Sequence, residues 1–170
     1  MDREFCKKFA AIEKVARMRL DRLNAATSLV DLSAIPGHRL EHLKGDRKGQ
    51  YSIRINDQFR VCFEWKDGDA EMRTKKLAPI HPGEHLADML KEAGITANAL
   101  ALRLRVPANR ISTIIQGKRS ITAETALRLG RYFGTSPQFW MNLQTKYDLD
   151  SAQDAVAEQI EREVIPQNAA

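Results

Sequence analysis

The periodicity of the apolar residues changes once along this chain, and that change limits the folds it can adopt. Between residues 39 and 65 apolar side chains alternate with polar ones, as Tyr51, Ile53 and Ile55 do. Such alternation is typical of strands with one buried face. From His81 onward the alternation stops, and signals for helix starts follow one another. The sequence therefore predicts an α+β chain whose strands precede most of its helices.

An amphipathic helix and three short strands are expected in the first half. Apolar residues recur at three- and four-residue steps from Phe5 to Leu23, which predicts the helix. The strands expected are Arg39–Leu43, Gln50–Asn56 and Phe59–Trp65, and the turn-forming cluster Asn56-Asp57-Gln58 makes the last two a β-hairpin. A closing strand would follow the turn at residues 66–69, but Met72–Lys76 has no apolar alternation.

The second half carries a helix-start signal at regular intervals. Prolines or hydroxyl residues stand where a first helical turn or an N-cap should be. A polar linker, about Asp67 to Pro79, separates this half from the first and suggests a junction. We expect a small helix-plus-antiparallel-sheet domain at 1–71 and an all-α domain of five or six short helices at 72–170. The signals are Pro82, Thr96, Pro107, Thr122 and Ser136-Pro137.

Charge is distributed unevenly along the chain. The formal charge is +5 at pH 7, yet residues 72–149 hold twelve basic and five acidic side chains. A locally basic helical domain favours a polyanionic partner, because Lys and Arg displace counterions from phosphates; a merely solvated basic surface is the alternative. No apolar run reaches the length of a membrane span and the first residues lack the apolar core of a signal peptide, so the cytoplasm is the expected location.

Neither a cofactor nor a metal is predicted. Cys6 and Cys62 lie far apart without the spacing of a zinc site or a disulfide framework. The pairs His38/His42 and His81/His85 have metal-like spacing, but the first falls in a strand-like region and the second straddles a helix start.

Residues 96–119 predict two short helices that meet at a tight turn. Thr96 caps the first helix, Pro107 begins the second, and small Ala101 allows the two helices to approach closely. The outward face of the second helix would enter a major groove of DNA, where Arg110 can pair with guanine. Lysine, arginine and hydroxyl side chains nearby suit phosphates. The predicted DNA-binding residues are Asn98, Ala108, Asn109, Arg110, Ser112, Thr113, Lys118 and Arg119.

The run VPANRISTIIQGKRSIT and its surroundings, about residues 79–149, closely resemble the HigA antitoxins, helix-turn-helix proteins of the xenobiotic-response-element class. The resemblance implies a five-helix, lambda-repressor-like domain that binds a palindromic operator as a homodimer, using its C-terminal helices. Arg105 departs from the family, which usually has glycine in the turn. A left-handed conformation there would cost about 1 to 2 kcal/mol for a residue with a β-carbon, so the turn is expected to be strained or reshaped.

The last segment predicts an amphipathic helix from Asp150 to Val164. Apolar residues occur at four-residue steps among acidic neighbours. Its apolar face can serve either a dimer contact or simple core packing, and both alternatives stay open.

Residues 26–65 resemble the HigB toxins of the RelE-like ribonuclease superfamily, whose genes lie next to HigA antitoxin genes. The resemblance implies a sheet that presents basic residues to ribosome-bound mRNA, and Lys44, Arg47, Arg54 and Arg60 match that basic set. Such toxins normally begin and end with strands that this chain lacks around its junction. We therefore expect weak or absent ribonuclease activity, unless a histidine such as His38 or His42 supplies the missing acid or base.

Together these features predict a truncated HigB-like toxin fused to a HigA-like antitoxin that represses its own operon. The partners expected are double-stranded operator DNA, a second copy of the chain, and a toxin–antitoxin contact within or between subunits; no membrane is expected. The alternative is a working ribosome-dependent mRNA endonuclease held in check by the fused half. A third possibility is that the toxin-like half binds a separate protein.

Overall fold

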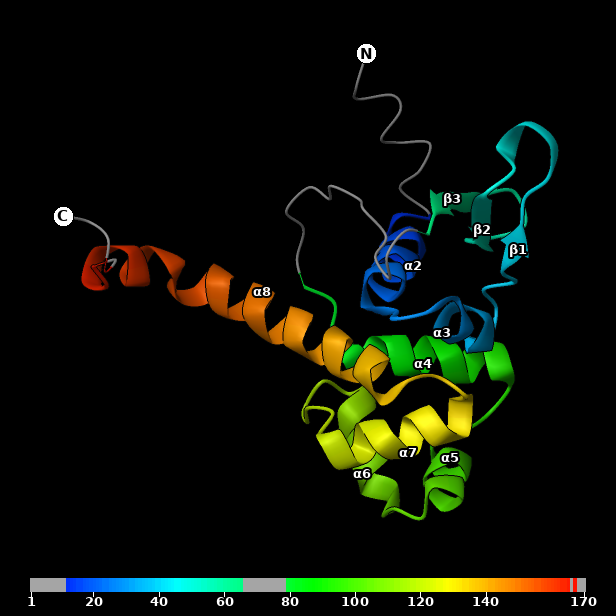
Figure 1. Ribbon diagram of the computed structural model, residues 1–170. Helices are drawn as coiled ribbons and strands as arrows, with labels where there is room; N and C mark the ends of the chain where they lie inside the picture. The colour runs from blue at the N-terminus through cyan, green and yellow to red at the C-terminus, as the bar shows by residue number, and fades with distance from the viewer. Residues whose placement is uncertain (1–11, 66–78, 166, 168–170) are drawn as a thin grey trace.

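The computed structural model describes residues 12–65, 79–165 and 167. Helices and a three-stranded sheet form the first half, and five helices form the second (Figure 1). The first half contains α2 (Glu13–Ala25), α3 (Leu29–Ala34), β1 (Glu41–His42), β2 (Gln50–Arg54) and β3 (Arg60–Glu64). The second half contains α4 (Pro82–Ala93), α5 (Ala97–Leu104), α6 (Ala108–Ile115), α7 (Ala123–Phe133) and α8 (Pro137–Glu163).

The sheet is antiparallel with the strands in the order β1-β2-β3. The expected hairpin is confirmed: Tyr51 lies opposite Phe63, and Asn56 accepts the backbone N–H groups of Gln58 and Phe59 in the turn. The first strand is shorter than expected, since only Glu41–His42 pairs with β2. The segment expected to lack a closing strand lies outside the described residues.

The helix starts of the second half follow the local signals in the sequence. The side chains of Thr96, Thr122 and Ser136 each accept a backbone N–H of the following helix, and Pro82 and Pro137 occupy first-turn positions. These caps satisfy N–H groups that have no partner inside the helix.

Two parts of the first half differ from the sequence expectation. Helix α3 was not expected; its signal is Ser28, which caps the helix by accepting the N–H of Asp31. Helix α2 is described from Glu13 and extends to Ala25, whereas the expected start at Phe5 lies outside the described residues.

The two halves share one hydrophobic core. Leu23, Leu32 and Ile53 from the first half belong to the same buried cluster as Leu86 and Trp140 from the second. Helix α4 lies between the first half of the chain and helices α5, α6 and α7 (Figure 1). Burying these side chains together stabilises both halves through the hydrophobic effect.

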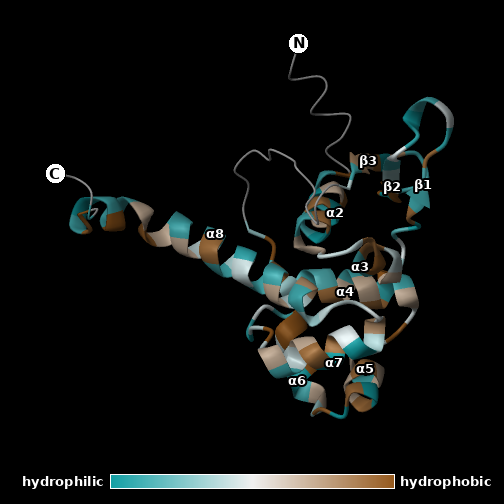
Figure 2. Cartoon of the chain, viewed as in Figure 1, coloured by the Kyte–Doolittle hydropathy of each residue, from teal (hydrophilic) through white to brown (hydrophobic). Residues whose placement is uncertain are grey.

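Helix α8 is much longer than expected. The tail predicted from Asp150 is continuous with the helix that starts at Pro137, so the second half holds four shorter helices and one of 27 residues. Its distal part extends away from the body, with apolar positions that no other element covers (Figure 2). Of the two alternatives for the tail, packing into the core of the same chain is therefore wrong, because Val156, Ile160 and Val164 are exposed. No helix within the described ranges has the length and apolar character that a bilayer crossing requires.

Candidate nucleic-acid interface

Helices α5 and α6 form the tight helical pair that the sequence predicted. Ala101, Ile111 and Ile114 are buried at their crossing. The turn between them contains Arg105 with φ of 56° and ψ of 46°, so a left-handed conformation occurs where the family usually has glycine. The residue is exposed and its N–H caps α5. The turn keeps its shape in spite of the β-carbon.

Gly83 at the start of α4 fixes the position of α6. A β-carbon on Gly83 would lie 1.8 Å from the carbonyl oxygen of Ile114, close to the end of α6. His81 caps α4 by accepting the N–H of Gly83 at Nδ1 over 2.9 Å. The backbone of α4 therefore supports α6 directly, with no side chain between them.

The predicted DNA-binding residues gather on and around α6. Ala108 and Asn109 are exposed at the start of the helix, whereas Arg110 and Thr113 are half-buried. Lys118 and Arg119 are exposed in the segment after α6, and Asn98 is exposed near the start of α5. At this end of the molecule α5 and α6 lie far from the sheet (Figure 1).

Two hydroxyl groups on α6 are engaged with the helix itself. Ser112 donates to the carbonyl of Asn109 over 3.2 Å, and Thr113 donates to the same carbonyl over 2.7 Å. A hydroxyl has one proton to donate, so each must rotate before it can donate to a phosphate.

Arg110 is held by a carboxylate that the sequence reasoning missed. Its Nη1 lies 3.2 Å from Oε2 of Glu124, in the first turn of α7. Glu124 also accepts from Arg128, and these two arginines lower the pKa of its carboxyl group, Arg128 contributing most. The four-residue spacing of Glu124 and Arg128 is a recognisable helix pair, but nothing in the sequence links it to Arg110.

The basic set of the first half lies on the outer face of the sheet. Arg54 and Arg60 are directly opposite in register, so their side chains share one face. Arg54 pairs with Asp57, and Arg60 pairs with Glu41 over 3.3 Å and donates to Ser52 Oγ over 2.9 Å.

The remaining members of that set lie in the loop before β2. Arg47 reaches Cys62 Sγ over 3.3 Å, on the same face as Arg60, whereas Lys44 is exposed. The structure thus brings Arg47, Arg54 and Arg60 together and gives two of them carboxylate partners.

Neither histidine of the first half can serve this basic face. His38 is fully buried, and burial lowers its pKa well below 6.5. His42 lies opposite Tyr51 in register and contacts its ring at 5.0 Å, on the face of the sheet opposite to Arg54. The structure therefore does not support the expectation that His38 or His42 supplies an acid or base there.

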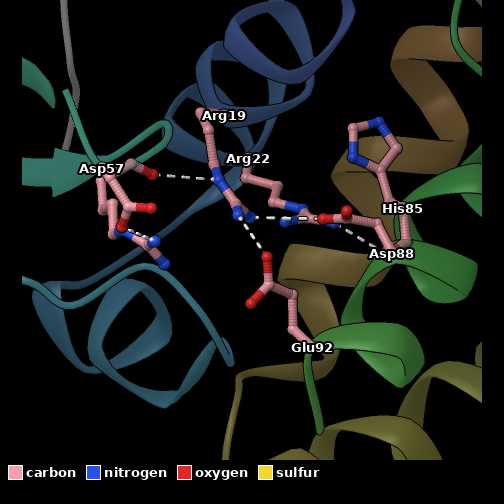
Figure 3. Close-up of polar contacts among 7 residues, drawn as sticks. Arg19, Arg22, Asp57, His85, Asp88 and Glu92 are labelled. Carbon is pink, nitrogen blue, oxygen red and sulfur yellow. Dashed lines mark hydrogen bonds and ion pairs between the residues drawn. The ribbon is translucent and has the colours of Figure 1, made fainter. Parts of the chain in front are cut away.

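Two buried arginines of α2 join the halves (Figure 3). Arg22 reaches Asp88 on α4 over 2.8 Å and donates to the carbonyl of His85 over 2.8 Å. Burial lowers the pKa of Arg22 to about 10, so it stays charged at neutral pH. Arg19 lies 3.3 Å from Asp88 and 3.4 Å from Glu92.

Arg19 extends the same cluster to the sheet. Its Nε donates to the backbone carbonyl of Arg54 over 3.2 Å. The side chain of Arg19, which belongs to α2, therefore contacts both β2 and α4. Within the described residues, no group of three or more His, Cys, Asp or Glu side chains could hold a metal ion.

A helix-turn-helix with a supporting α4, joined to a helix-plus-sheet unit with a basic outer face, defines a two-part protein of the toxin–antitoxin kind. Family comparison agrees: residues 2–79 match the RelE-like toxin of type II toxin-antitoxin system HigB, and residues 86–140 match a helix-turn-helix family. The second half of the chain belongs to the HigA antitoxin family: it is 39% identical over 79 residues to antitoxin HigA-1 of Vibrio cholerae, a match that covers 46% of this chain and 74% of that antitoxin. The match to the HigB toxin model lies in the same polypeptide.

Individual relatives match each half separately. The chain is 51% identical over 79 residues to virulence-associated protein I of Dichelobacter nodosus. The matched stretch covers 46% of this chain and 73% of that protein. It is 46% identical over 61 residues to toxin HigB-1 of Vibrio cholerae, which covers 36% of this chain and 64% of the toxin.

Several of the similar solved structures carry DNA, and one of these is a HigA antitoxin. It is described as the Pseudomonas aeruginosa antitoxin HigA with the higBA promoter. It is 51% identical to this chain with a TM-score of 0.51, over 52% of this chain and 98% of the antitoxin.

Proposed function

We propose that this protein represses its own operon by binding operator DNA through α6, while its toxin-like half stays inactive. The position of α6 carries the proposal: Ala108 and Asn109 are exposed at its start, and the toxin-like half packs at the other end of the second half (Figure 1). The fusion therefore leaves the groove-binding face uncovered. The similar Pseudomonas antitoxin, described with its promoter, supports DNA binding by this half of the chain.

The site residues divide by chemistry into base readers and phosphate contacts. Asn109 and Arg110 carry groups that pair bidentately with adenine and guanine. Lys118 and Arg119 are exposed point charges next to the helix and suit phosphates. Specificity is assigned to the first pair and general affinity to the second.

A homodimer would form through the distal part of α8. Leu149, Val156, Ile160 and Val164 are exposed by 64%, 38%, 51% and 60% along one side of the helix. Steps of seven and four residues keep these apolar side chains on one side of the helix, so that the stripe of one copy can pack against the stripe of another. Two copies related by a twofold axis would then present two α6 helices to a palindromic operator.

The toxin-like half is proposed to be a neutralised remnant, residues 1–71, attached to an antitoxin domain at 72–170. Cleavage of RNA by its own 2′-hydroxyl needs a base, an acid and charge stabilisation of the phosphorane. The basic face can supply the charge, but two of its arginines are paired with Asp57 and Glu41 and no histidine lies on it.

The test is fluorescence anisotropy of the full chain against its own upstream duplex and a scrambled duplex over a salt series. A steep salt dependence with clear operator preference is expected. Arg110→Ala should weaken operator binding by about 1 to 3 kcal/mol and reduce the base preference at one operator position. Lys118→Ala should weaken binding to all DNA sequences alike. Binding without any operator preference would contradict the proposal.

One observation favours the alternative of a working mRNA endonuclease. The outer face of the sheet is open, since Glu41, Cys62 and Glu64 on it are exposed. Ribosome-dependent mRNA cleavage by the purified chain, abolished by Arg54→Ala or Arg60→Ala, would establish this function. Copurification of another protein with the first half would instead indicate a binding module.

A further inference from the structure

A continuous chain of polar contacts connects the recognition helix with the turn before it. Arg110 on α6 pairs with Glu124 over 3.2 Å, and Glu124 accepts from Nε and Nη2 of Arg128 over 3.0 and 2.9 Å. Arg128 in turn donates to the carbonyl of Leu104 over 2.8 Å, at the end of α5. Glu124 therefore stands between the two arginines and ties α6 to both neighbouring helices.

This contact uses only part of the Arg110 side chain. A guanidinium has five N–H donors in a rigid plane, and one carboxylate oxygen on Nη1 leaves the other edge free. The side chain of Arg110 is only 21% exposed, so its aliphatic part packs on the protein. A guanidinium held in this way is already oriented, whereas a free arginine loses rotamer freedom when it binds a base.

The charge of Glu124 adds a second effect. Its side chain is 56% exposed beside the recognition helix, where the phosphate backbone of a bound duplex would approach. A carboxylate repels phosphates whatever the base sequence, so it weakens binding to every duplex. Because this repulsion acts on all duplexes alike, it lowers the general affinity for DNA, while the base preference depends on the orientation of Arg110.

We propose that Glu124 is a positioning residue that sets base specificity at the position read by Arg110. It holds the guanidinium of Arg110 in a base-reading orientation, and its charge weakens binding to every duplex. The inference rests on the proposed DNA-binding function and adds a residue outside the helix-turn-helix itself. A purely structural role is less favoured, because Glu124 is not needed to cap α7; Thr122 already does so.

The experiment compares Glu124→Ala with Glu124→Gln in the full chain. Anisotropy is measured against the operator, a scrambled duplex and a set of single-base operator variants, over a salt series. For Glu124→Ala, binding to the scrambled duplex should tighten and preference at one base position should fall about tenfold, which is within the range of one bidentate pair. Its salt slope should steepen by about 0.9 for each phosphate that Arg110 or Arg128 newly contacts.

The second variant separates orientation from charge. The amide oxygen of Glu124→Gln can still accept from Arg110, so base preference should be largely retained while binding to all duplexes tightens. Adding Glu124→Ala to Arg110→Ala should cause no further loss of preference at that base position, because Glu124 acts there only through Arg110.

A matched control removes a distant charge of the same kind. Glu158 is exposed on the side of α8 opposite to its apolar stripe, so Glu158→Ala should leave base preference and salt slope unchanged. Melting temperatures verify that each variant is folded. Unchanged base preference in folded Glu124→Ala, or equal loss at every base position, would overturn the inference, whereas absence of operator preference in the unaltered chain would overturn the proposed function itself.

Discussion

The carboxylate of Asp31 in α3 accepts hydrogen bonds from both the backbone N–H and the hydroxyl of Ser136, the N-cap of α8. The same carboxylate accepts from the N–H and hydroxyl of Thr27 over 2.8 and 2.9 Å. Burial acts to raise the pKa of Asp31, but these four hydrogen bonds outweigh it and the pKa is lowered below 3.8. A single side chain of the toxin-like half thus anchors the start of the longest helix in the other half.

Replacing Asp31 with alanine should destabilise the whole protein. The N–H and hydroxyl groups of half-buried Ser136 and exposed Thr27 would lose their acceptor, and because water can replace it in part, each lost hydrogen bond should cost about 0.5 to 1.5 kcal/mol. Urea unfolding followed by circular dichroism measures the loss, with the exposed Asp46→Ala as control. Because the folded pKa is the lower one, the stabilisation is present above pH 3.8 and is lost as the pH falls below it. An Asp31→Ala protein as stable as the control would contradict this role.

Two ion pairs between α2 and α4 should differ sharply in their contribution to the free energy of unfolding. Arg22 is fully buried against Asp88, whereas the pair of Lys14 and Glu84, at 2.6 Å, is largely exposed. Removing Arg22 takes the closer partner away from Asp88, which keeps Arg19 at 3.3 Å, and leaves a cavity in place of a fully buried side chain, so Arg22→Ala should cost about 2 to 5 kcal/mol. Lys14→Ala should cost about 0 to 1 kcal/mol. Denaturant unfolding of the two variants tests this, and similar losses would refute the distinction.

Acidification should destabilise the protein through two buried histidines. Burial and then the neighbouring Arg22 and Arg19 lower the pKa of His38 and His85 well below 6.5. Below pH 6.5 the two imidazole rings take up protons in the unfolded chain but not in the folded protein. The free energy of unfolding therefore falls by about 1.4 kcal/mol per pH unit for each ring. The nearby carboxyl of Asp21, 3.8 Å from His85, has a pKa raised by burial from 3.8.

The measurement is the unfolding free energy at several pH values between 7 and 5.5. Substituting His85 with glutamine should remove about half of the pH dependence. Substituting the exposed His42 with glutamine should leave the buried contribution intact. A stability that stays flat from pH 7 to 5.5 would count against the prediction.

Gly83→Ala should destabilise the protein although helix propensity alone predicts a gain. Alanine is favoured over glycine in a helix by about 1 kcal/mol. Here the added carbon would meet the Ile114 carbonyl, so α4 and α6 must separate, which costs about 1 to 3 kcal/mol or more. Thermal unfolding gives the sign of the change directly. A raised melting temperature would mean that α6 adjusts without strain.

Arg105→Gly should stabilise the turn between α5 and α6. It removes about 1 to 2 kcal/mol of left-handed strain and adds an entropic cost of about 0.5 to 1 kcal/mol, so a net gain of about 0 to 1.5 kcal/mol is expected. Equilibrium unfolding of the variant checks this. If stability falls instead, the arginine side chain contributes contacts that outweigh its strained backbone.

Local structure could be predicted from the sequence, whereas long-range contacts could not. Helix starts at Thr96, Thr122 and Ser136 depend on caps within three residues, and the hairpin depends on its own alternation. The sequence did not predict the length of α8, because the pattern of the tail predicts a separate helix from Asp150, whereas the helix continues unbroken through that residue. Contacts such as Arg22 with Asp88 join residues far apart in sequence, and no local pattern marks them.

The same division applies to the candidate site. Residues of α6 could be predicted as a candidate reading face because residue types that suit base recognition occupy adjacent positions on one helix. Glu124 could not, since its importance comes from the distance to Arg110 in the folded chain. The carboxylate partners of Arg54 and Arg60 likewise appear only when the strands pair.

A core shared by two halves of one polypeptide also removes the effect of dilution. Two separate chains dissociate once their concentration drops below the dissociation constant of the complex. Tethered halves face each other at a fixed effective concentration, in the millimolar range for short flexible connections, whatever the cell contains. Because Leu23 and Leu86 belong to one buried cluster, each molecule carries its toxin-like and HigA-like halves in a constant one-to-one ratio. Scarcity of the protein would therefore release no free toxin-like half.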